Sequence, residues 1–517
     1  MKYQDLIKKH ASKNKPEVFG ALTCFQVKVE DIVGVCQDLS VNHKLHLKTI
    51  TAQDLGKEFK IIYIFGVPKE HVFLAPYILV KESFPSVTPI MHEASNYERK
   101  IKTLFGLTPK GHPSLRSIIL HENWPDNVYP LRKSFNWKER PQKGGVQFQF
   151  RKMIGEGIYE IPVGPVHAGI IEPGHFRFSV AGEEILMLEP RLGYTHKGSE
   201  KLFEVLSLEE KVKLAERISG DSSFSHALAF CQAVEQLGKI EISEREEYLR
   251  VIFAELERVA NHLGDIGAIM TDTGFNFGGA QGGRLREIVM QINEKLTGSR
   301  FLRGVIKIGG VNADLTSDQA KKLAEDLEKL KADFSEVIKI AMGTGSLLTR
   351  LKKTGVLNER IARDHGALGV AGRAVGFEMD ARVDYPYAAY DKIKVEVAKE
   401  NSGDVYARFR VRVQELLNSI EILKQALWDL PKEEKGRDGK DINLEKNSYS
   451  IGVVEGWRGD IVYLVATDSK GQITRVDVRD PSFINWTVLG HAGQGNMVPD
   501  FPLINKSFNL SYTGNDL

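Results

Sequence analysis

Two long stretches with apolar residues at helical spacing constrain the fold of this 517-residue chain more than any other feature. The first follows Thr316 and Gln319, which form a capping-box pair. Its apolar positions, at steps of mostly three and four, are Leu323, Leu327, Leu330, Phe334, Val337 and Ile338. The second stretch carries Val405, Phe409, Val413, Leu416, Leu417 and Ile420. A stripe of this kind buries one face of a helix, so the sequence predicts long helices packed around a core.

Strand patterns lie on both sides of these helices. Capping-box pairs at Ser207 with Glu210 and at Ser243 with Glu246 predict that two further helices begin there, after the first group of strands. The expected strands are residues 159–162, 176–180 and 184–189 before the helices, and 450–455, 461–467 and 473–478 after them. We therefore expect residues 158–517 to form one domain, a helix bundle with β pieces at both ends.

The first 140 residues have a different pattern, which predicts a small N-terminal α/β domain. Residues 59–67 and 71–80 are rich in Ile, Val, Tyr and Phe, as strands are. Residues 96–105 form a short amphipathic helix that Gly106 ends. A polar stretch with Pro and paired Gly follows, and residues 141–157 are the expected linker. The chain as a whole is predicted to be of the α+β class with two domains.

Composition excludes several classes of protein. The formal net charge of +2 is too balanced for nucleic-acid binding. The three cysteines, Cys24, Cys36 and Cys231, show no CxxC spacing, so neither a zinc or iron–sulfur site nor a disulfide scaffold is expected. No stretch approaches the ~18 apolar residues of a membrane span, and none resembles a signal peptide. We expect a protein of the cytoplasm, or one held at a membrane by partners.

The most informative motif is a hairpin loop over residues 164–177, which contains His167, Glu172 and His175. A loop on a rigid base can hold reactive side chains exposed. The alternative is a plain hairpin whose histidines cap backbone groups. A Gly-rich stretch at 277–283 lacks the order of a phosphate-binding motif and is expected to be a flexible loop. Residues 382–387 are expected to form an interface or core turn.

Several longer motifs carry a family resemblance. GPVH and EPGHFRF at 164–178, followed by RLGYTHKGSEKL at 191–202, resemble the 49-kDa-type subunit of respiratory complex I and the large subunit of group 4 membrane-bound [NiFe] hydrogenases. Residues 97–125 and 128–135 resemble the complex I 30-kDa-type subunit, and residues 489–517 resemble the end of the hydrogenase-like branch. The chain is therefore similar to a fusion of the two subunit types, as in the fused C/D-type proteins of the family.

The departures from this family narrow the expected chemistry. Ser219, Ser222, Ser482 and Asn485 stand where the hydrogenases have the four cysteines that hold nickel and iron. A hydroxyl is a poor ligand for low-valent nickel, so no metal site is expected and the chain by itself is not expected to be a hydrogenase. This pattern is similar to the energy-converting-hydrogenase-related branch, which lacks these cysteines.

The resemblance also implies candidate site residues. His175 matches the loop histidine beside the quinone of complex I, and Asp272 matches the aspartate coupled to it. The quinone-binding tyrosine falls on Gly220, which leaves quinone binding open. Glu172 matches a proton-transferring loop glutamate of the hydrogenase branch, and its alternative is a solvated carboxylate. The candidate residues lining a cavity around these groups are His167, His196, Arg217 and His226.

The implied function is that of one subunit in a respiratory-type oxidoreductase, related to NADH-quinone oxidoreductases and hydrogenases. Electrons would arrive from a [4Fe-4S] cluster in a partner iron–sulfur subunit, and antiporter-like membrane subunits would move protons. At the family level the resemblance also implies quinone and NAD binding, although this chain is expected to hold no cofactor itself. The expected location is the cytoplasmic side of the inner membrane. The two alternatives are a redox-silent scaffold and a quinone-reducing subunit with a rearranged pocket.

Overall fold

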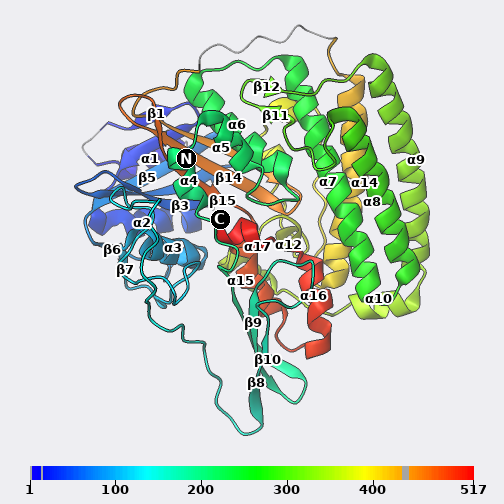
Figure 1. Ribbon diagram of the computed structural model, residues 1–517, viewed down its shortest axis with the longest axis horizontal. Helices are drawn as coiled ribbons and strands as arrows, with labels where there is room; N and C mark the ends of the chain where they lie inside the picture. Colours follow the sequence, from blue (N-terminus) through cyan, green and yellow to red (C-terminus); the bar gives the residue numbers. More distant parts are fainter. Residues whose placement is uncertain (1–2, 13–14, 433–441) are drawn as a thin grey trace.

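A computed structural model describes residues 3–12, 15–432 and 442–517 of the chain (Figure 1). Its N-terminal part is a five-stranded sheet in the order β1-β2-β5-β4-β3, in which only the β2–β5 pair is parallel. The strands are β1 (Glu17–Phe19), β2 (Leu22–Gln26), β3 (His46–Asp54), β4 (Phe59–Val67) and β5 (Val72–Val80). The short helices here are α1 (Tyr3–His10), α2 (Ile32–Gln37) and α3 (Ser95–Phe105). The predicted strands and the predicted helix, which ends at left-handed Gly106, are confirmed.

The region between the two predicted domains contains little regular structure. After β6 (Ser83–Pro85) and β7 (Thr108–Lys110), the described residues 111–157 form only turns, bends and extended chain. This region includes the expected linker, although the domain boundaries themselves stay a prediction.

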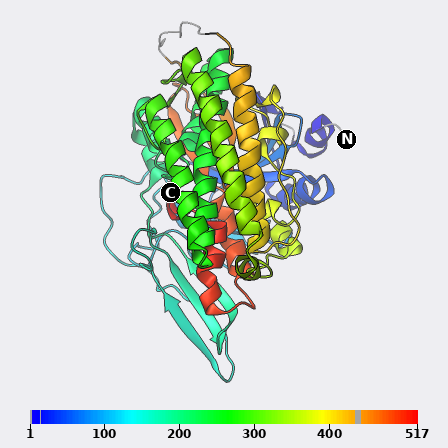
Figure 2. The ribbon, with the colours of Figure 1, turned by 90° about the vertical axis from the view of Figure 1, so that its right-hand side faces the viewer.

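Four long helices form the bundle, as the apolar stripes predict (Figure 2). They are α7 (Glu244–Asp272), α8 (Asn276–Thr297), α9 (Ser317–Met342) and α14 (Val405–Trp428). Ser243 and Thr316 accept hydrogen bonds from the amides three residues on, as their predicted capping roles require. Shorter elements complete this part: α4 (Ser199–Val205), α5 (Leu208–Ala215), α6 (Ser223–Gly238), β11 (Ile306–Lys307), β12 (Gly310–Val311), α10 (Gly345–Leu351), α11 (Glu359–Asp364), α12 (Gly369–Arg373) and α13 (Ala381–Asp384).

The flexible loop expected at 277–283 is wrong, because these residues belong to α8. The glycines serve helix packing instead of chain flexibility. A Cβ atom added at Gly282 would lie 2.5 Å from the Cα of Gly267 in α7. The two backbones therefore approach as closely as they do because neither position carries a side chain.

Two three-stranded antiparallel sheets lie outside the bundle. The first, β8 (Ile158–Val163), β9 (His175–Ala181) and β10 (Glu184–Arg191), projects from the body of the molecule (Figures 1 and 2). The second is β13 (Tyr449–Gly456), β14 (Gly459–Thr467) and β15 (Ile473–Arg479). The chain then forms α15 (Ser482–Ala492), α16 (Phe501–Phe508) and α17 (Tyr512–Asp516). The β pieces expected before and after the bundle are both confirmed.

The second sheet packs against the N-terminal domain through buried charges as well as apolar contacts. Lys48 of β3 pairs with Asp460 of β14 at 2.8 Å, and Lys100 of α3 lies 3.5 Å from Asp477 of β15 and 2.9 Å from Glu200 of the adjacent α4. Buried Tyr385 lies in the apolar cluster shared by β2, β4, β5, β13 and β14. This confirms the interface or core turn expected at 382–387. The two halves of the chain therefore share a buried interface.

Candidate functional site

The loop between β8 and β9 is held against α17. The Glu172 carboxylate accepts a hydrogen bond from the amide of Thr513 at 3.1 Å, and His167 Nε2 lies 3.0 Å from the hydroxyl of Tyr512. Gly174 packs directly on the Tyr512 ring, where a Cβ would clash at 2.3 Å. Burial raises the pKa of Glu172 above its ordinary value and lowers the pKa of His167. Two of the candidate residues, His167 and Glu172, are thus both held by contacts with α17.

The same C-terminal segment reaches the positions where the family has cysteines. The hydroxyls of Ser219 and Ser511 lie 2.9 Å apart, and the Ser511 amide donates to the hydroxyl of Ser482 at 2.9 Å. Ser222 is buried as well, and buried Asn485 bonds both backbone groups of Leu368. We call the four positions Ser219, Ser222, Ser482 and Asn485 the serine site. The hydroxyls of Ser219 and Ser482 and the amide of Asn485 bond to protein, and none of the four side chains offers a thiolate to nickel or iron.

An ion pair borders the serine site. The Arg458 guanidinium binds the Asp221 carboxylate through both of its terminal nitrogens at 2.7 Å, and Ser219 donates to Asp221 at 3.0 Å. Burial raises the pKa of Asp221, but the charge of Arg458 outweighs it, so the pKa lies below its ordinary value. Asn261 of α7 donates its side-chain amide to the backbone of Asp221 at 2.7 Å. Helix α7 is therefore attached to this site through Asn261.

Polar contacts continue from the ion pair into the bundle. Arg458 donates from Nε to the carbonyl of Asn509 at 2.5 Å, and the Asn509 side chain donates to Asp265 at 2.6 Å. The other oxygen of Asp265 accepts from Arg412 of α14 at 2.8 Å. A chain of hydrogen bonds through Arg458, Asn509 and Asp265 thereby links Asp221 to Arg412 in the interior of the bundle.

A second buried group lies behind the serine site. His226 contacts Asp480 through Nε2 and the Tyr463 hydroxyl through Nδ1, both at 3.0 Å. Burial works against ionised Asp480, but its hydrogen bond with His226 brings the pKa below the ordinary value. Glu257 of α7 accepts from Ser225 at 2.5 Å, and burial raises its pKa to about 7. The region therefore contains several groups that can hold a proton.

The structure does not bring His175 and Asp272 together. His175 lies at the start of β9 with Gly164 O at 3.4 Å and the Phe150 ring at 5.2 Å. Asp272 lies exposed at the end of α7, and within the described chain no hydrogen bond or ion pair joins the two. Burial lowers the pKa of His175 and raises that of Asp272, which the charge of Lys506 offsets only in part. Loop 164–174, which precedes His175, folds toward α17 instead.

Two remaining candidates lie at different depths. His196 Nδ1 contacts the carbonyl of Asp516 at 2.7 Å, and burial lowers its pKa. Arg217 points to the surface and donates to the carbonyl of Lys213 at 2.5 Å. Gly220, at the tyrosine position, is exposed and supplies no side-chain donor to a quinone.

Over residues 3–12, 15–432 and 442–517, no three His, Cys, Asp or Glu side chains are grouped to hold a metal ion.

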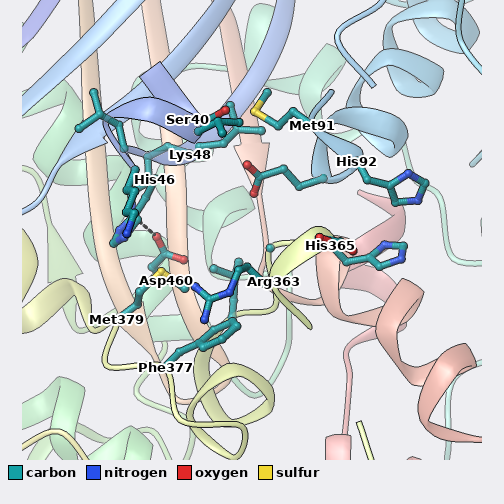
Figure 3. Close-up of a pocket in the computed structure, with 18 of the residues that line it drawn as sticks. Ser40, His46, Lys48, Met91, His92, Arg363, His365, Phe377, Met379 and Asp460 are labelled. Carbon is teal, nitrogen blue, oxygen red and sulfur yellow. Dashed lines mark hydrogen bonds and ion pairs between the residues drawn. The ribbon is translucent and has the colours of Figure 1, made fainter. Parts of the chain in front are cut away.

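A large cleft of about 1210 Å³ opens elsewhere, between the N-terminal sheet and the segment that contains α11 and α13 (Figure 3). The ion-paired Lys48 and Asp460 line it, together with His46, His92 and His365. Leu368 also lines this cleft, and it is the residue that Asn485 bonds. The cleft therefore adjoins the serine site at Asn485.

Sequence reasoning missed the Asp221–Arg458 pair, the Asp480–His226 contact and the role of residues 509–513. Asp221 lies between Ser219 and Ser222, so its position in that motif was available as a signal. Its partner Arg458 follows it by 237 residues, and no local pattern connects the two.

Comparison with known proteins agrees with this architecture. Residues 25–141 match the family described as respiratory-chain NADH dehydrogenase, 30 Kd subunit. Residues 272–450 and 440–516 match the respiratory-chain NADH dehydrogenase, 49 Kd subunit family. The chain belongs to the complex I-like group in which these two domains are fused, which also contains hydrogenase subunits. The family resemblance and the fold class predicted from sequence are confirmed.

Three relatives illustrate the group. The chain is 33% identical to formate hydrogenlyase subunit 5 of Escherichia coli over 84% of this chain and 77% of that protein. It is 32% identical to hydrogenase-4 component G of the same organism, over 95% and 87%. It is 31% identical to the C/D subunit of the NADH-quinone oxidoreductase of Phocaeicola vulgatus, over 83% and 87%. None of the described helices has the length and apolarity that a membrane crossing requires.

Proposed function

We propose that this chain is the coupling subunit of a membrane-associated, respiratory-type oxidoreductase complex and works without a nickel–iron centre. A partner iron–sulfur subunit delivers electrons beside loop 164–174, and membrane subunits move ions in response. The chain itself sits peripherally, on the cytoplasmic side of the membrane. The observation that carries the proposal is the polar path that begins at Asp221 and Arg458 beside this loop and ends at Arg412 in the bundle.

The loop offers a surface for the partner. Ile170 is fully exposed and Val166 is 79% exposed, although both are apolar. We take these two exposed apolar side chains as part of the surface that contacts the partner. The loop is attached through Glu172 and through the His167–Tyr512 contact to the segment that carries Ser511. A partner that moves the loop therefore acts on the serine site directly.

Charge at this site can respond to electron arrival through two carboxylates. Glu172 is exposed at the surface, yet its pKa is raised and Asp221 contributes to that rise, so the charge of each carboxylate affects the other. An electron arriving nearby favours protonation of Glu172. Protonation of Glu172 then changes the electrostatic potential at the Asp221–Arg458 pair. This pair is the first member of the polar path into the bundle.

A second candidate function, the redox-silent scaffold, is favoured by the buried and internally bonded state of the serine site. In a scaffold the loop would couple partners mechanically and no proton would move. The quinone-reducing alternative has less support, because Gly220 supplies no donor.

The test uses the intact complex purified from native membranes with Glu172→Gln, and with Glu183→Gln in the turn of the same sheet as the control. Partner recovery and redox-driven proton uptake are measured on the same preparations. The proposal expects Glu172→Gln to retain partners and lose proton uptake, while the control retains both. Full proton uptake with Glu172→Gln would refute the proton role, and a parallel loss of partners and activity would favour the scaffold.

A further inference from the structure

A smaller cleft of about 260 Å³ lies where α3, the 111–157 region, β10 and α15 meet. Four of the residues that line it are arginines: Arg99, Arg116, Arg151 and Arg191. They come from three separate parts of the chain. Of the described residues that line this cleft, none belongs to the serine site, and only His491 also lines the large cleft of Figure 3. A concentration of guanidinium groups in one concave site needs negative charge nearby.

The four arginines differ in their carboxylate partners. Arg116 forms an ion pair with Glu189, and Arg191 forms one with Glu122. In the described part of the chain, Arg99 and Arg151 form no ion pair. The guanidinium of Arg99 instead donates to neutral oxygens, namely the carbonyl of Arg116 at 2.8 Å, the Asn96 side chain at 3.2 Å and the carbonyl of Ser117 at 3.4 Å.

These contacts orient Arg99 but do not neutralise it. Burial, followed by repulsion from Arg116, lowers the pKa of Arg99 to about 10. Arg151 adds to this repulsion, and Glu189 offsets it only in part. The cleft therefore holds two uncompensated positive charges next to two paired ones.

The ion-paired arginines are also held in place. The Phe148 ring lies 4.4 Å from the Arg191 guanidinium and 5.5 Å from that of Arg116. Stacking on an aromatic ring reduces the freedom of both side chains. The cleft is thus preorganised for an anion before the anion binds.

We propose that this cleft binds a phosphate monoester. A monoester carries a charge of about −1.5 to −2 at neutral pH, which matches the two uncompensated guanidinium groups, whereas a carboxylate supplies one charge. Arginine pairs with phosphate through two parallel hydrogen bonds. The cleft volume of about 260 Å³ can hold a phosphate monoester group. The ester is either a small soluble molecule or the headgroup of a lipid such as phosphatidic acid, since Met153 and Ile154 beside Arg151 are 40% and 96% exposed.

The test measures binding of glycerol 3-phosphate to the full chain by calorimetry and binding to phosphatidic acid vesicles by flotation, with phosphatidylcholine vesicles for comparison. We expect Arg99→Gln and Arg151→Gln each to weaken binding at least about fivefold, because each removes a charge-assisted pair. The Arg151 guanidinium carries no hydrogen bond to the rest of the described chain, so Arg151→Gln isolates binding from folding. Arg284→Gln, an exposed arginine paired with Asp333, is the matched control and should bind normally.

Each arm has a decisive outcome. Arginine-dependent binding of glycerol 3-phosphate identifies a soluble ester, and arginine-dependent binding of phosphatidic acid vesicles alone identifies a lipid. Absence of binding in both arms, or binding that Arg151→Gln leaves unchanged, would overturn the proposal. Because these assays involve no electron transfer, their result does not depend on the proposed respiratory function.

Discussion

Two adjacent glycines in α8 allow a sharp test of the helix packing. Gly282 faces α7, where an added Cβ would lie 2.5 Å from Gly267 Cα, 3.0 Å from Gly267 N and 3.2 Å from the carbonyl oxygen of Leu263. Gly283, one residue on in the same helix, has no atom within 4 Å of the same position. Alanine at either position has the same helix propensity, so any difference between them arises from packing.

The expected magnitudes follow from these distances. Gly283→Ala should stabilise the chain by about 0.5–1 kcal/mol, because alanine loses less backbone entropy than glycine in a helix. Gly282→Ala gains the same amount but forces two backbones apart, and overpacking costs about 1–3 kcal/mol. With contacts to backbone atoms as short as 2.5 Å, we expect the upper half of that range and a net loss of about 1–2.5 kcal/mol.

The assay is urea unfolding of the purified chain, followed by far-ultraviolet circular dichroism, for the parent and both variants. The midpoint should move upward for Gly283→Ala and downward for Gly282→Ala. Equal midpoints for the two variants would show that α7 and α8 are not packed through Gly267, and would refute the structural explanation of the glycine-rich segment.

The remaining predictions concern acid stability and metal content. The His365 ring lies between those of His92 and His491, at 4.4 and 4.9 Å, and burial lowers its pKa to about 3. Because the unfolded chain binds this proton more readily, stability should fall as the pH drops below about 6.5, by about 1–2 kcal/mol at pH 5 after allowance for solvent. Thermal unfolding at pH 7.5 and 5 should show a smaller acid loss for His365→Gln, and an unchanged loss would contradict this. Elemental analysis of the purified chain should find no stoichiometric nickel, and one nickel per chain would refute the interpretation of Ser219 and Ser482.

Local patterns were sufficient for most of the fold and misleading for one segment. The β-branched and aromatic run at 59–67 and the stripe after Thr316 each specify their element from neighbouring residues alone. The stretch at 277–283 has poor helix propensity, yet it is helical because Gly282 packs on Gly267. Tertiary packing overrides propensity there, and its partner lies outside any local window.

The candidate site was predictable only where a motif marked it. Glu172 and the serines lie in recognisable motifs, and the structure brings them to one segment around Ser511. The family resemblance predicted that His175 is coupled to Asp272. In the structure loop 164–174, which precedes His175, folds toward α17, and no sequence pattern indicates the direction that this loop takes. Whether these residues act in turnover stays a prediction.

The buried ion pairs between the two halves have a consequence for assembly. Lys48 and Lys100 would each face water, and Asp460 and Glu200 would lose a partner, if the halves were made as separate chains. Association of two separate chains would be concentration-dependent and would have to desolvate these four charges. In one chain the halves meet at an effective concentration on the order of millimolar, whatever the expression level. A single polypeptide therefore guarantees equal amounts of both modules and removes one step from the construction of the complex.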